Sequence, residues 1–309
     1  MAGISSYRGR FAPSPTGALH FGSLLAALAS FLDARAHQGR WLLRMEDLDP
    51  PREIKGAADQ ILRTLEGFGF YWDGPVRYQS QHLDHYAQAV HQLLEQQKAY
   101  ACSCSRQQLM QQRQRQQAPS SCCSCSRQQI GDQPAAIRVR VQDGLTGLIE
   151  FNDGIQGNYP QQPRQPFREP VGDFVIRRKD GFYAYQLAVV IDDADQQISH
   201  IVRGYDLIDS TPRQIYLQQL LQLATPEYAH IPILVNDSGQ KLSKQTFASA
   251  LDPRRPEPSL FQALTLLGHR PPEDLRAAST HEMLDWGVNH WRRSRVPQQP
   301  QLAESLLES

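Results

Sequence analysis

The sequence predicts an α/β fold: a Rossmann-like domain with an inserted cysteine-bearing segment and a short helical region at its C-terminal end. Apolar runs of strand length alternate with segments of helical periodicity along most of the chain. A turn rich in proline and glycine separates the first strand from the first helix, and all five cysteines lie between Cys102 and Cys125. A chain of 309 residues can bury one large core.

The order of the elements is typical of a doubly wound parallel sheet. Residues 8–12 and 41–45 are predicted buried strands on either side of a helix over 23–37, which together make a βαβ unit. Further helices are expected over 53–68, 82–97, 185–193 and 211–223, and further strands over 137–141, 173–178, 199–202 and 231–235. Beyond Ala250, short helices are expected over 259–268, 273–278 and 281–293.

The charges of the chain balance, with 32 Lys and Arg against 32 Asp and Glu. A polyanionic partner must therefore be met by local basic clusters, each of which could equally be a solvated face. The clusters are Arg106, Arg113, Arg115 and Arg127; Arg177, Arg178 and Lys179; and Arg292, Arg293 and Arg295. The apolar run from Leu24 to Leu32 is too short to span a bilayer, so we expect a cytoplasmic monomer without a membrane partner.

The stretch from Arg10 to Ser23, RFAPSPTGALHFGS, predicts a phosphate-binding turn. Its prolines and Gly17 prevent a regular element, and Gly22 lets a ligand approach the backbone. The apolar run that follows can form a helix whose N-terminal N–H groups attract an anion, with His20 at its mouth.

A second polar loop far downstream, residues 236–245 with the sequence NDSGQKLSKQ, presents Lys241 and Lys244 with a serine between them. Two lysines on a glycine-containing loop can close over phosphate as a mobile clamp.

Together the two motifs resemble the two signatures of class I aminoacyl-tRNA synthetases, and Arg-Phe-Ala-Pro-Ser-Pro-Thr-Gly-x-Leu-His is similar to their glutamyl branch. The resemblance runs from Tyr7 to about Gln245. It implies the Rossmann-like catalytic domain of that class in two halves, 1–98 and 171–235. A zinc-bearing, acceptor-binding-like insertion over 99–170 would divide them, and the lysine loop and helical region would occupy 236–309.

In that family the carboxylate of the amino acid attacks the α-phosphate of ATP. The resemblance therefore implies glutamate, and ATP with Mg²⁺, as substrates. Catalytic roles fall on His20, Gly22, Ser23, Lys241 and Lys244, of which His20, Gly22 and Lys244 would also bind ATP.

The resemblance also implies a glutamate pocket. Arg10 and Arg203 match the cations for the side-chain carboxylate, and Glu46 matches the acid that holds the ammonium. The remaining pocket residues would be Phe11, Ala12, Pro13, Ser14 and Tyr185.

Taken from the residues alone, plainer interpretations stay open. His20 could be a structural cap, Glu46 a surface acid and Tyr185 a core aromatic with a satisfied hydroxyl. Arg203 could form a structural ion-pair group with Asp192 and Asp193.

The cysteines form Cys102-x-Cys104 and Cys122-Cys123-x-Cys125, a spacing that predicts one tetrahedral thiolate zinc site. The expected ligands are Cys102, Cys104, Cys122 and Cys125, with Cys123 as a competitor in the second pair. Buried thiols without metal are the alternative. The resembling family uses a tyrosine and one cysteine in the second half; no tyrosine lies between Cys104 and Cys125, so an all-cysteine site would replace that arrangement.

Only residues 245–309 follow Lys244, where a full glutamyl-tRNA synthetase continues into a large anticodon-binding region. We therefore expect no anticodon-binding domain. This arrangement is similar to a branch of the family that transfers glutamate onto queuosine in the anticodon loop of tRNA(Asp), which implies that tRNA as a partner. Two alternatives stay open: a short enzyme that charges a tRNA 3′ end, and a non-catalytic, zinc-dependent RNA-binding paralogue.

Overall fold

The centre of the fold is a set of parallel strands. The computed structural model describes residues 7–105, 107–109, 111, 134–141, 149–159, 172–236, 238–241 and 250–307. Strand β1 (Arg8–Phe11) pairs with β2 (Arg40–Met45), β2 with β3 (Arg77–Tyr78), and β9 (His200–Gly204) with β10 (Glu227–Ile231), all in parallel. The N–H of Ser199 donates to the carbonyl of Arg8 at 3.0 Å, which places β9 beside β1. The predicted α/β fold is confirmed, with the strands in the spatial order β3, β2, β1, β9, β10.

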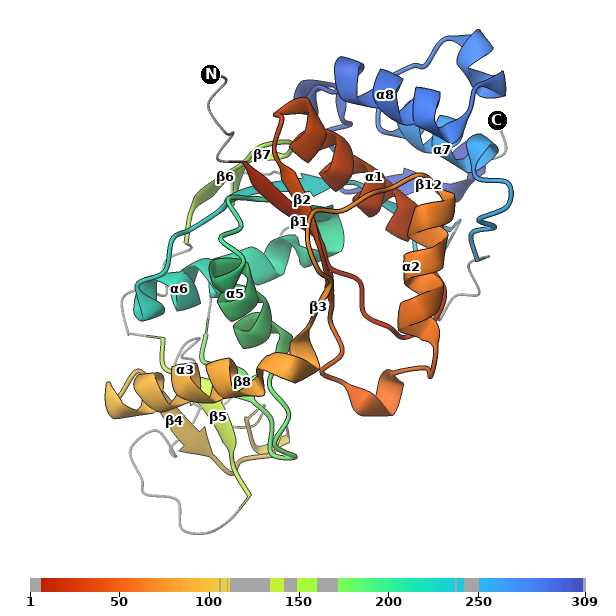
Figure 1. The fold of residues 1–309 in the computed structure, drawn as a ribbon. Coiled ribbons are helices and arrows are strands. Elements are labelled where there is room, and N and C mark those ends of the chain that lie inside the picture. Colours follow the sequence, from red (N-terminus) through yellow and green to blue (C-terminus); the bar gives the residue numbers. More distant parts are fainter. Residues whose placement is uncertain are drawn as a thin grey trace, which may run out of the picture.

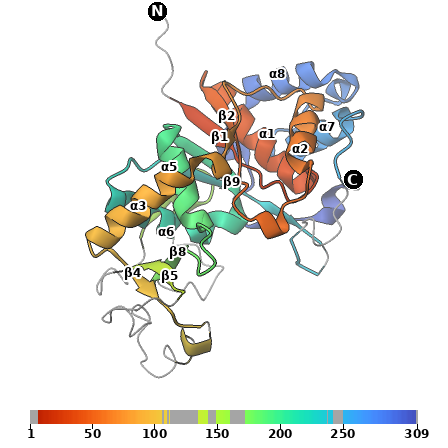
Figure 2. The ribbon, with the colours of Figure 1, turned by 60° about the horizontal axis from the view of Figure 1, so that its bottom comes forward.

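Helices flank these strands at both ends of the molecule. They are α1 (Phe21–Ala36), α2 (Ala57–Gly67), α3 (Leu83–Glu95), α5 (Tyr185–Asp195), α6 (Thr211–Leu221), α7 (Glu257–Leu266) and α8 (Thr280–His290). Helices α7 and α8 lie beside α1 at one end, and α3 lies with β4, β5 and β8 at the other (Figures 1 and 2). Within the described ranges, none of the helices combines the length and apolar character that a membrane span requires.

The predicted helix over 53–68 is wrong in its first turn. Residues Pro50–Arg52 instead form a short 3-10 helix, and α2 begins only at Ala57. Gly56 precedes α2 with a φ of +81°, a left-handed conformation that ends the preceding turn and that glycine adopts at little cost.

The segment between the two halves of the parallel sheet contains two antiparallel units. Strands β4 (Ala99–Cys102), β5 (Ala136–Val139) and β8 (Phe174–Arg177) form one sheet, in that order. Strands β6 (Phe151–Asp153) and β7 (Gly157–Tyr159) form a hairpin that lies against β10. The sequence did not predict this hairpin, because three-residue strands are too short to show an alternating pattern.

The predicted strand over 231–235 is two strands in the structure. Strand β10 ends at Ile231, and β11 (Ile233–Val235) pairs with β12 (Gln301–Ala303). Pro232 separates them because it has no N–H to donate to a ladder. The region after the lysine loop therefore contributes a strand as well as helices, and its predicted helix over 273–278 is a short 3-10 helix, Glu273–Ala277.

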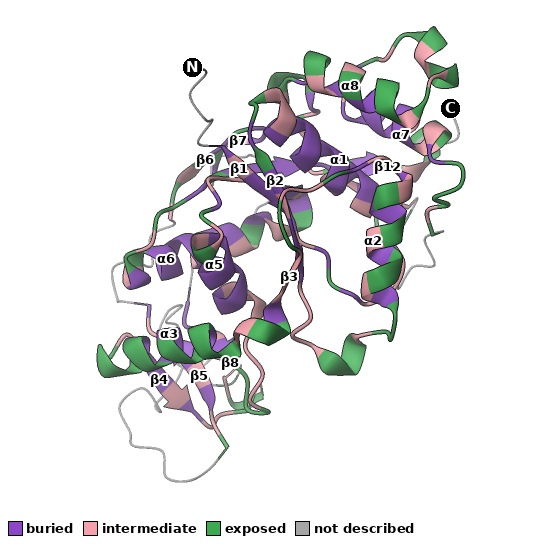
Figure 3. Cartoon of the chain, viewed as in Figure 1, coloured by how far each residue is buried: buried purple, intermediate pink, exposed green. Residues whose placement is uncertain are grey.

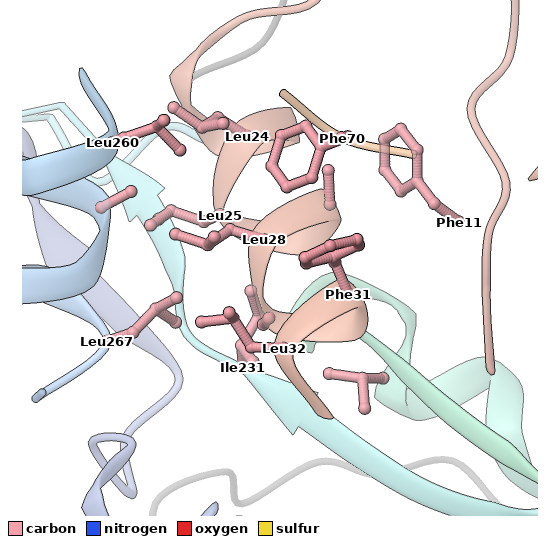
Figure 4. Close-up of a cluster of buried hydrophobic side chains, with 14 of the residues drawn as sticks. Phe11, Leu24, Leu25, Leu28, Phe31, Leu32, Phe70, Ile231, Leu260 and Leu267 are labelled. Carbon is pink, nitrogen blue, oxygen red and sulfur yellow. The ribbon is translucent and has the colours of Figure 1, made fainter. Parts of the chain in front are cut away.

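Helix α1 is buried on almost every side (Figure 3). Its buried side chains Leu24, Leu25, Leu28, Phe31 and Leu32 meet Phe70, Ile231, Leu260 and Leu267 in one cluster (Figure 4). Helix α8 approaches so closely that a Cβ on Gly287 would lie 2.9 Å from a methyl carbon of Leu32. The core therefore fixes α1, and with it the N-terminal end of α1, from several directions.

A buried carboxylate ties α1 to both ends of the described chain. Asp33 accepts hydrogen bonds from the hydroxyl of Tyr7, from Nε1 of Trp291 at 2.8 Å and from Nη2 of Arg293 at 2.7 Å. Burial alone would raise the pKa of Asp33, but the hydrogen bonds and charge of Arg293 hold that pKa below its usual value. Arg293, expected in a basic surface cluster, instead serves a structural ion pair.

We expect Arg293→Ala to lower the free energy of unfolding by about 3 kcal/mol, because it leaves the Asp33 carboxylate buried without its cation. Urea denaturation followed by circular dichroism measures the loss. The matched control is Arg292→Ala at the neighbouring exposed position, with an expected loss below about 1 kcal/mol. Equal losses in the two variants would contradict the structural role of the Asp33 ion pair.

Candidate active site

A cleft of about 1080 Å³ opens at the carboxyl ends of β1, β2, β9 and β10, where doubly wound sheets bind their ligands. Every predicted catalytic or pocket residue that the structure describes lines it: Arg10, Phe11, Ala12, Pro13, Ser14, His20, Gly22, Ser23, Glu46, Tyr185, Arg203 and Lys241. Lys244 lies outside the described residues. A cleft of this volume can hold a nucleotide together with a small second substrate.

One end of the cleft is suited to phosphate. Gly22 and Ser23, in the first turn of α1, line it, and that turn contains no acidic residue. His20 is the N-cap residue, with extended backbone, and its side chain makes no capping hydrogen bond. The partial positive charge of the helix N-terminus is therefore directed at the cleft, and no acidic side chain of the first turn of α1 neutralises it.

Lys241 adds a cation to the lining of the cleft. Its ammonium lies 2.6 Å from Oδ2 of Asp206, and an isolated bridge to Val235 holds its backbone. Both side chains are partly exposed, so the ion pair is weak and Lys241 can exchange Asp206 for a ligand phosphate.

Arg203 supplies a buried cation with neutral partners. Its guanidinium donates to Nε2 of His230 at 3.0 Å and to the hydroxyls of Tyr185 and Thr211 at 3.3 and 2.8 Å. Only 4% of the residue is exposed, and in the described part of the chain no carboxylate oxygen lies within 4.0 Å of it. Arg203 therefore retains a positive charge for a ligand, and its alternative pairing with Asp192 and Asp193 is wrong.

The two aspartates instead hold other arginines. Asp193 accepts from Nε of Arg10 at 3.1 Å and from Nη1 of Arg44 at 2.8 Å. Asp192 accepts from Nε of Arg77 at 2.8 Å. The charge of Arg10 is thus largely balanced within the protein, in contrast to that of Arg203.

Arg44 is a site residue that the sequence analysis missed. It is fully buried, and its Nη2 lies 3.5 Å from Oε1 of Glu46, so it joins Glu46 to the Asp193 network. The available signal was a charged residue after three apolar residues in the buried part of strand β2. A guanidinium in a buried strand needs polar partners, and those of Arg44 include the carboxylates of Asp193 and Glu46.

Glu46 extends from the end of β2, and its N–H donates to the carbonyl of Pro13 at 3.0 Å. Burial raises the pKa of its carboxyl to about 7, against the opposing effect of Arg44 and Arg10. Burial also raises the pKa of the Tyr185 phenol, which keeps that hydroxyl neutral. The cleft thus presents a cation at Arg203 and a proton-binding acid at Glu46, a pair that suits an amino acid with a carboxylate side chain.

The structure describes only some of the cysteines and some of the residues in the basic clusters. Cys102, buried at the end of β4, and Cys104 pack with Tyr100 and Leu109. The cysteines at 122, 123 and 125 and the arginines at 106, 113, 115 and 127 lie outside the described residues. Where residues are described, no group of three or more potential metal ligands occurs. Arg178 lines the cleft, 3.7 Å from Asp49.

Residues 6–292 match the family described as tRNA synthetases class I (E and Q), catalytic domain. A glutamyl-Q tRNA(Asp) synthetase of Pseudomonas aeruginosa is 52% identical over 303 residues, covering 98% of this chain and 99% of that protein. A protein of the same name from Neisseria meningitidis is 51% identical over 297 residues, covering 94% and 97%. The crystal structure of a glutamate tRNA ligase from Elizabethkingia meningosepticum, in complex with its amino acid, is similar with a TM-score of 0.75 and 25% identity, covering 98% of this chain and 68% of that one.

We expect the Glu46 carboxyl to titrate near pH 7 in the ligand-free protein, because burial disfavours its charge. Carbon-13 NMR of labelled glutamate side chains measures this, and the signal lost in Glu46→Gln assigns it. A bound ammonium favours the carboxylate, so affinity for an amino acid should fall as the pH falls through 7. Titration near pH 4 with a flat affinity profile would contradict the assignment.

Proposed function

The chain belongs to the class I tRNA synthetase family (E and Q), and from this premise we propose that it is an ATP-dependent ligase that glutamylates tRNA(Asp). It activates glutamate as glutamyl-adenylate without tRNA, then transfers the glutamate to queuosine in the anticodon loop. Relatives named glutamyl-Q tRNA(Asp) synthetase, matched along nearly their whole length, support this acceptor. The observation that carries the proposal is the buried Arg203 cation, which has no carboxylate partner among the residues that the structure describes, in one cleft with Glu46.

In the proposed complex the two ends of glutamate meet opposite charges. The side-chain carboxylate binds the Nη atoms of Arg203, with the Tyr185 hydroxyl beside it, and the ammonium binds Glu46. Arg10, already paired with Asp193, adds positive potential to the same pocket. Phe11, Ala12, Pro13 and Ser14 form the wall of the cleft along the ligand.

The phosphate end then performs the activation. The α-carboxylate of glutamate attacks the α-phosphorus of ATP, the bond to the β-phosphate oxygen breaks, and pyrophosphate leaves with its Mg²⁺. The N-terminal turn of α1, with His20, Gly22 and Ser23, holds the phosphates. Lys241 and Lys244 neutralise the charge that develops on the departing pyrophosphate.

The second step consumes the adenylate. A hydroxyl of the queuosine diol attacks the activated carbonyl carbon, an ester bond forms, and AMP leaves. The acceptor is an anticodon loop, so we propose a cytoplasmic enzyme whose basic clusters bind the loop backbone. Among the described members of those clusters, Arg178 lines the cleft and would therefore contact the loop nearest to the site of transfer.

We also propose one structural zinc ion per chain, held by Cys102, Cys104, Cys122 and Cys125. Cys102 is the last residue of β4, Cys104 follows two residues later, and both belong to one small cluster, which supports a role as two ligands of one ion. When bound, such a closed thiolate site stabilises the fold around it and does no chemistry.

Labelled glutamate should appear on tRNA(Asp) that contains queuosine, even after removal of the 3′-terminal adenosine, because the modified base is the acceptor. An unmodified transcript should accept none. Acid precipitation followed by scintillation counting measures the transfer, and Lys244→Ala is the control for labelling that the enzyme does not catalyse. Labelling that needs the 3′ end and ignores the base modification would establish the short glutamyl-tRNA synthetase instead. A protein without glutamate-dependent ATP–pyrophosphate exchange would be the non-catalytic paralogue.

Elemental analysis should find one zinc per chain, and Cys102→Ser or Cys104→Ser should release it while ATP binding survives, because the site stabilises only its own segment. Cys123→Ser is the matched control and should keep the metal. A zinc-free protein with unchanged thermal stability would refute the site, and metal loss in Cys123→Ser with retention in Cys122→Ser or Cys125→Ser would change its ligand set.

A further inference from the structure

Arg203 is the end of a buried chain of hydrogen bonds that starts outside the cleft. Arg203 and His230 face each other across the β9–β10 ladder, and Nε of Arg203 donates to Nε2 of His230 at 3.0 Å. On the far side of the ring, Nδ1 of His230 contacts Oδ2 of Asp153, the last residue of β6. All three residues are less than 5% exposed.

The partners of Asp153 fix the tautomer of the imidazole. Oδ1 of Asp153 accepts from the N–H groups of Ile155, Gln156 and His230 at 3.0, 2.9 and 3.0 Å. Those bonds keep Asp153 an ionised acceptor, so Nδ1 of His230 must carry the hydrogen and Nε2 must present its lone pair to Arg203. Burial lowers the pKa of His230, against the effect of Asp153, and keeps the ring neutral.

We propose that His230 and Asp153 are positioning residues that make the pocket select a carboxylate side chain. His230 orients the guanidinium of Arg203 through a neutral acceptor, so the side chain is held in place and its positive charge is not neutralised. Arg10 shows the contrast, since the carboxylate of Asp193 both orients and neutralises it. The inference rests on the proposed function, because it concerns how the glutamate pocket distinguishes glutamate from glutamine.

The β6–β7 hairpin, which lies in the segment between the two halves of the parallel sheet, places Asp153 against His230. The N–H of Gly154 donates to the carbonyl of Tyr228, and Nε2 of Gln156 donates to the carbonyl of His230, both at 2.8 Å. The hairpin is thus docked on β10 on both sides of the imidazole. The Tyr228 ring also stacks parallel to that of His230 and lies 5.3 Å from the guanidinium carbon of Arg203. The hydrogen-bond partners of Arg203 among the described residues are neutral, and the carboxylate of Asp153 is one residue further away, beyond His230.

Two variants of one residue separate the contacts. In His230→Asn the shorter side chain keeps a donor near Asp153 but cannot reach Arg203, whereas the longer side chain of His230→Gln places an acceptor near Arg203. The matched control is His269→Asn: His269 is buried too, and its Nε2 accepts from the N–H of Arg292 at 3.0 Å, away from the cleft.

Glutamate-dependent ATP–pyrophosphate exchange is measured for all three variants, with glutamate and with glutamine. In His230→Asn we expect at least a tenfold higher KM for glutamate, at least a tenfold lower preference for glutamate over glutamine, and little change in kcat or in the KM for ATP. His230→Gln should restore both values to within about threefold of the wild type, and His269→Asn should leave them unchanged. A folded His230→Asn enzyme with wild-type KM and preference would overturn the inference.

A measurement on the unaltered protein decides the case in which His230→Asn does not fold. Nitrogen-15 NMR of labelled histidine should show a neutral ring protonated on Nδ1 at pH 7, whereas an imidazolium or an Nε2–H ring would overturn the inference. Failure of the proposed function looks different: the wild type would then show no exchange at all. In that event the rise in Tm caused by glutamate relative to glutamine, compared between wild type and His230→Asn, still tests the positioning role.

Discussion

The burial of α1 on almost every side is the constraint on which the site depends. A helix without a solvent face must be covered by other elements, and here the parallel strands, Phe70 and helices α7 and α8 cover it. The Asp33 network adds a polar tie from α1 to Arg293 and Tyr7. Because the helix cannot shift within this packing, its N-terminal turn is a preorganised donor group at the floor of the cleft. The region after the lysine loop thus belongs to the same core as α1, whose N-terminal turn is the proposed phosphate site.

The arginines in and behind the cleft are paired in two different ways. Arg10, Arg44 and Arg77 meet the carboxylates of Asp192 and Asp193 in a balanced network, and Arg44 joins Glu46 to it. Arg203 meets a phenol, a hydroxyl and an imidazole. Burying a cation without a counter-ion costs free energy in the ligand-free protein, and a ligand carboxylate recovers that cost. The free-energy cost of the buried, unpaired Arg203 charge therefore favours binding of an anion in this pocket.

The sequence predicted those residues of the cleft that belong to recognisable motifs. Its long helices, and the strands that correspond to β1, β2, β5, β8, β9 and β11, occur close to where the sequence placed them, and every described residue proposed for the glutamate pocket lines the cleft. It did not reveal His230 and Asp153, because a histidine in a short apolar strand and an aspartate in a hairpin turn have common structural explanations. Their roles depend on strand register, which pairs residue 230 with residue 203, and register is not readable from short strands. For Arg293 the sequence suggested the wrong role. A run of arginines resembles a solvated basic face, and only the structure shows that Arg293 pairs with the buried Asp33.

The family includes enzymes for both glutamate and glutamine, and the two side chains differ by little in shape. A cleft wall alone could not separate them, because a pocket distinguishes near-isosteres poorly by volume. A neutral amide would leave the Arg203 charge buried and unpaired, at a cost of about 2–5 kcal/mol, or about 30- to 4000-fold in affinity. That discrimination needs no added contact with the correct substrate, only the absence of a protein carboxylate near Arg203. In the proposed complex a single acidic side chain within reach of that guanidinium would remove this discrimination, and the neutral groups of Tyr185, Thr211, Tyr228 and His230 preserve it.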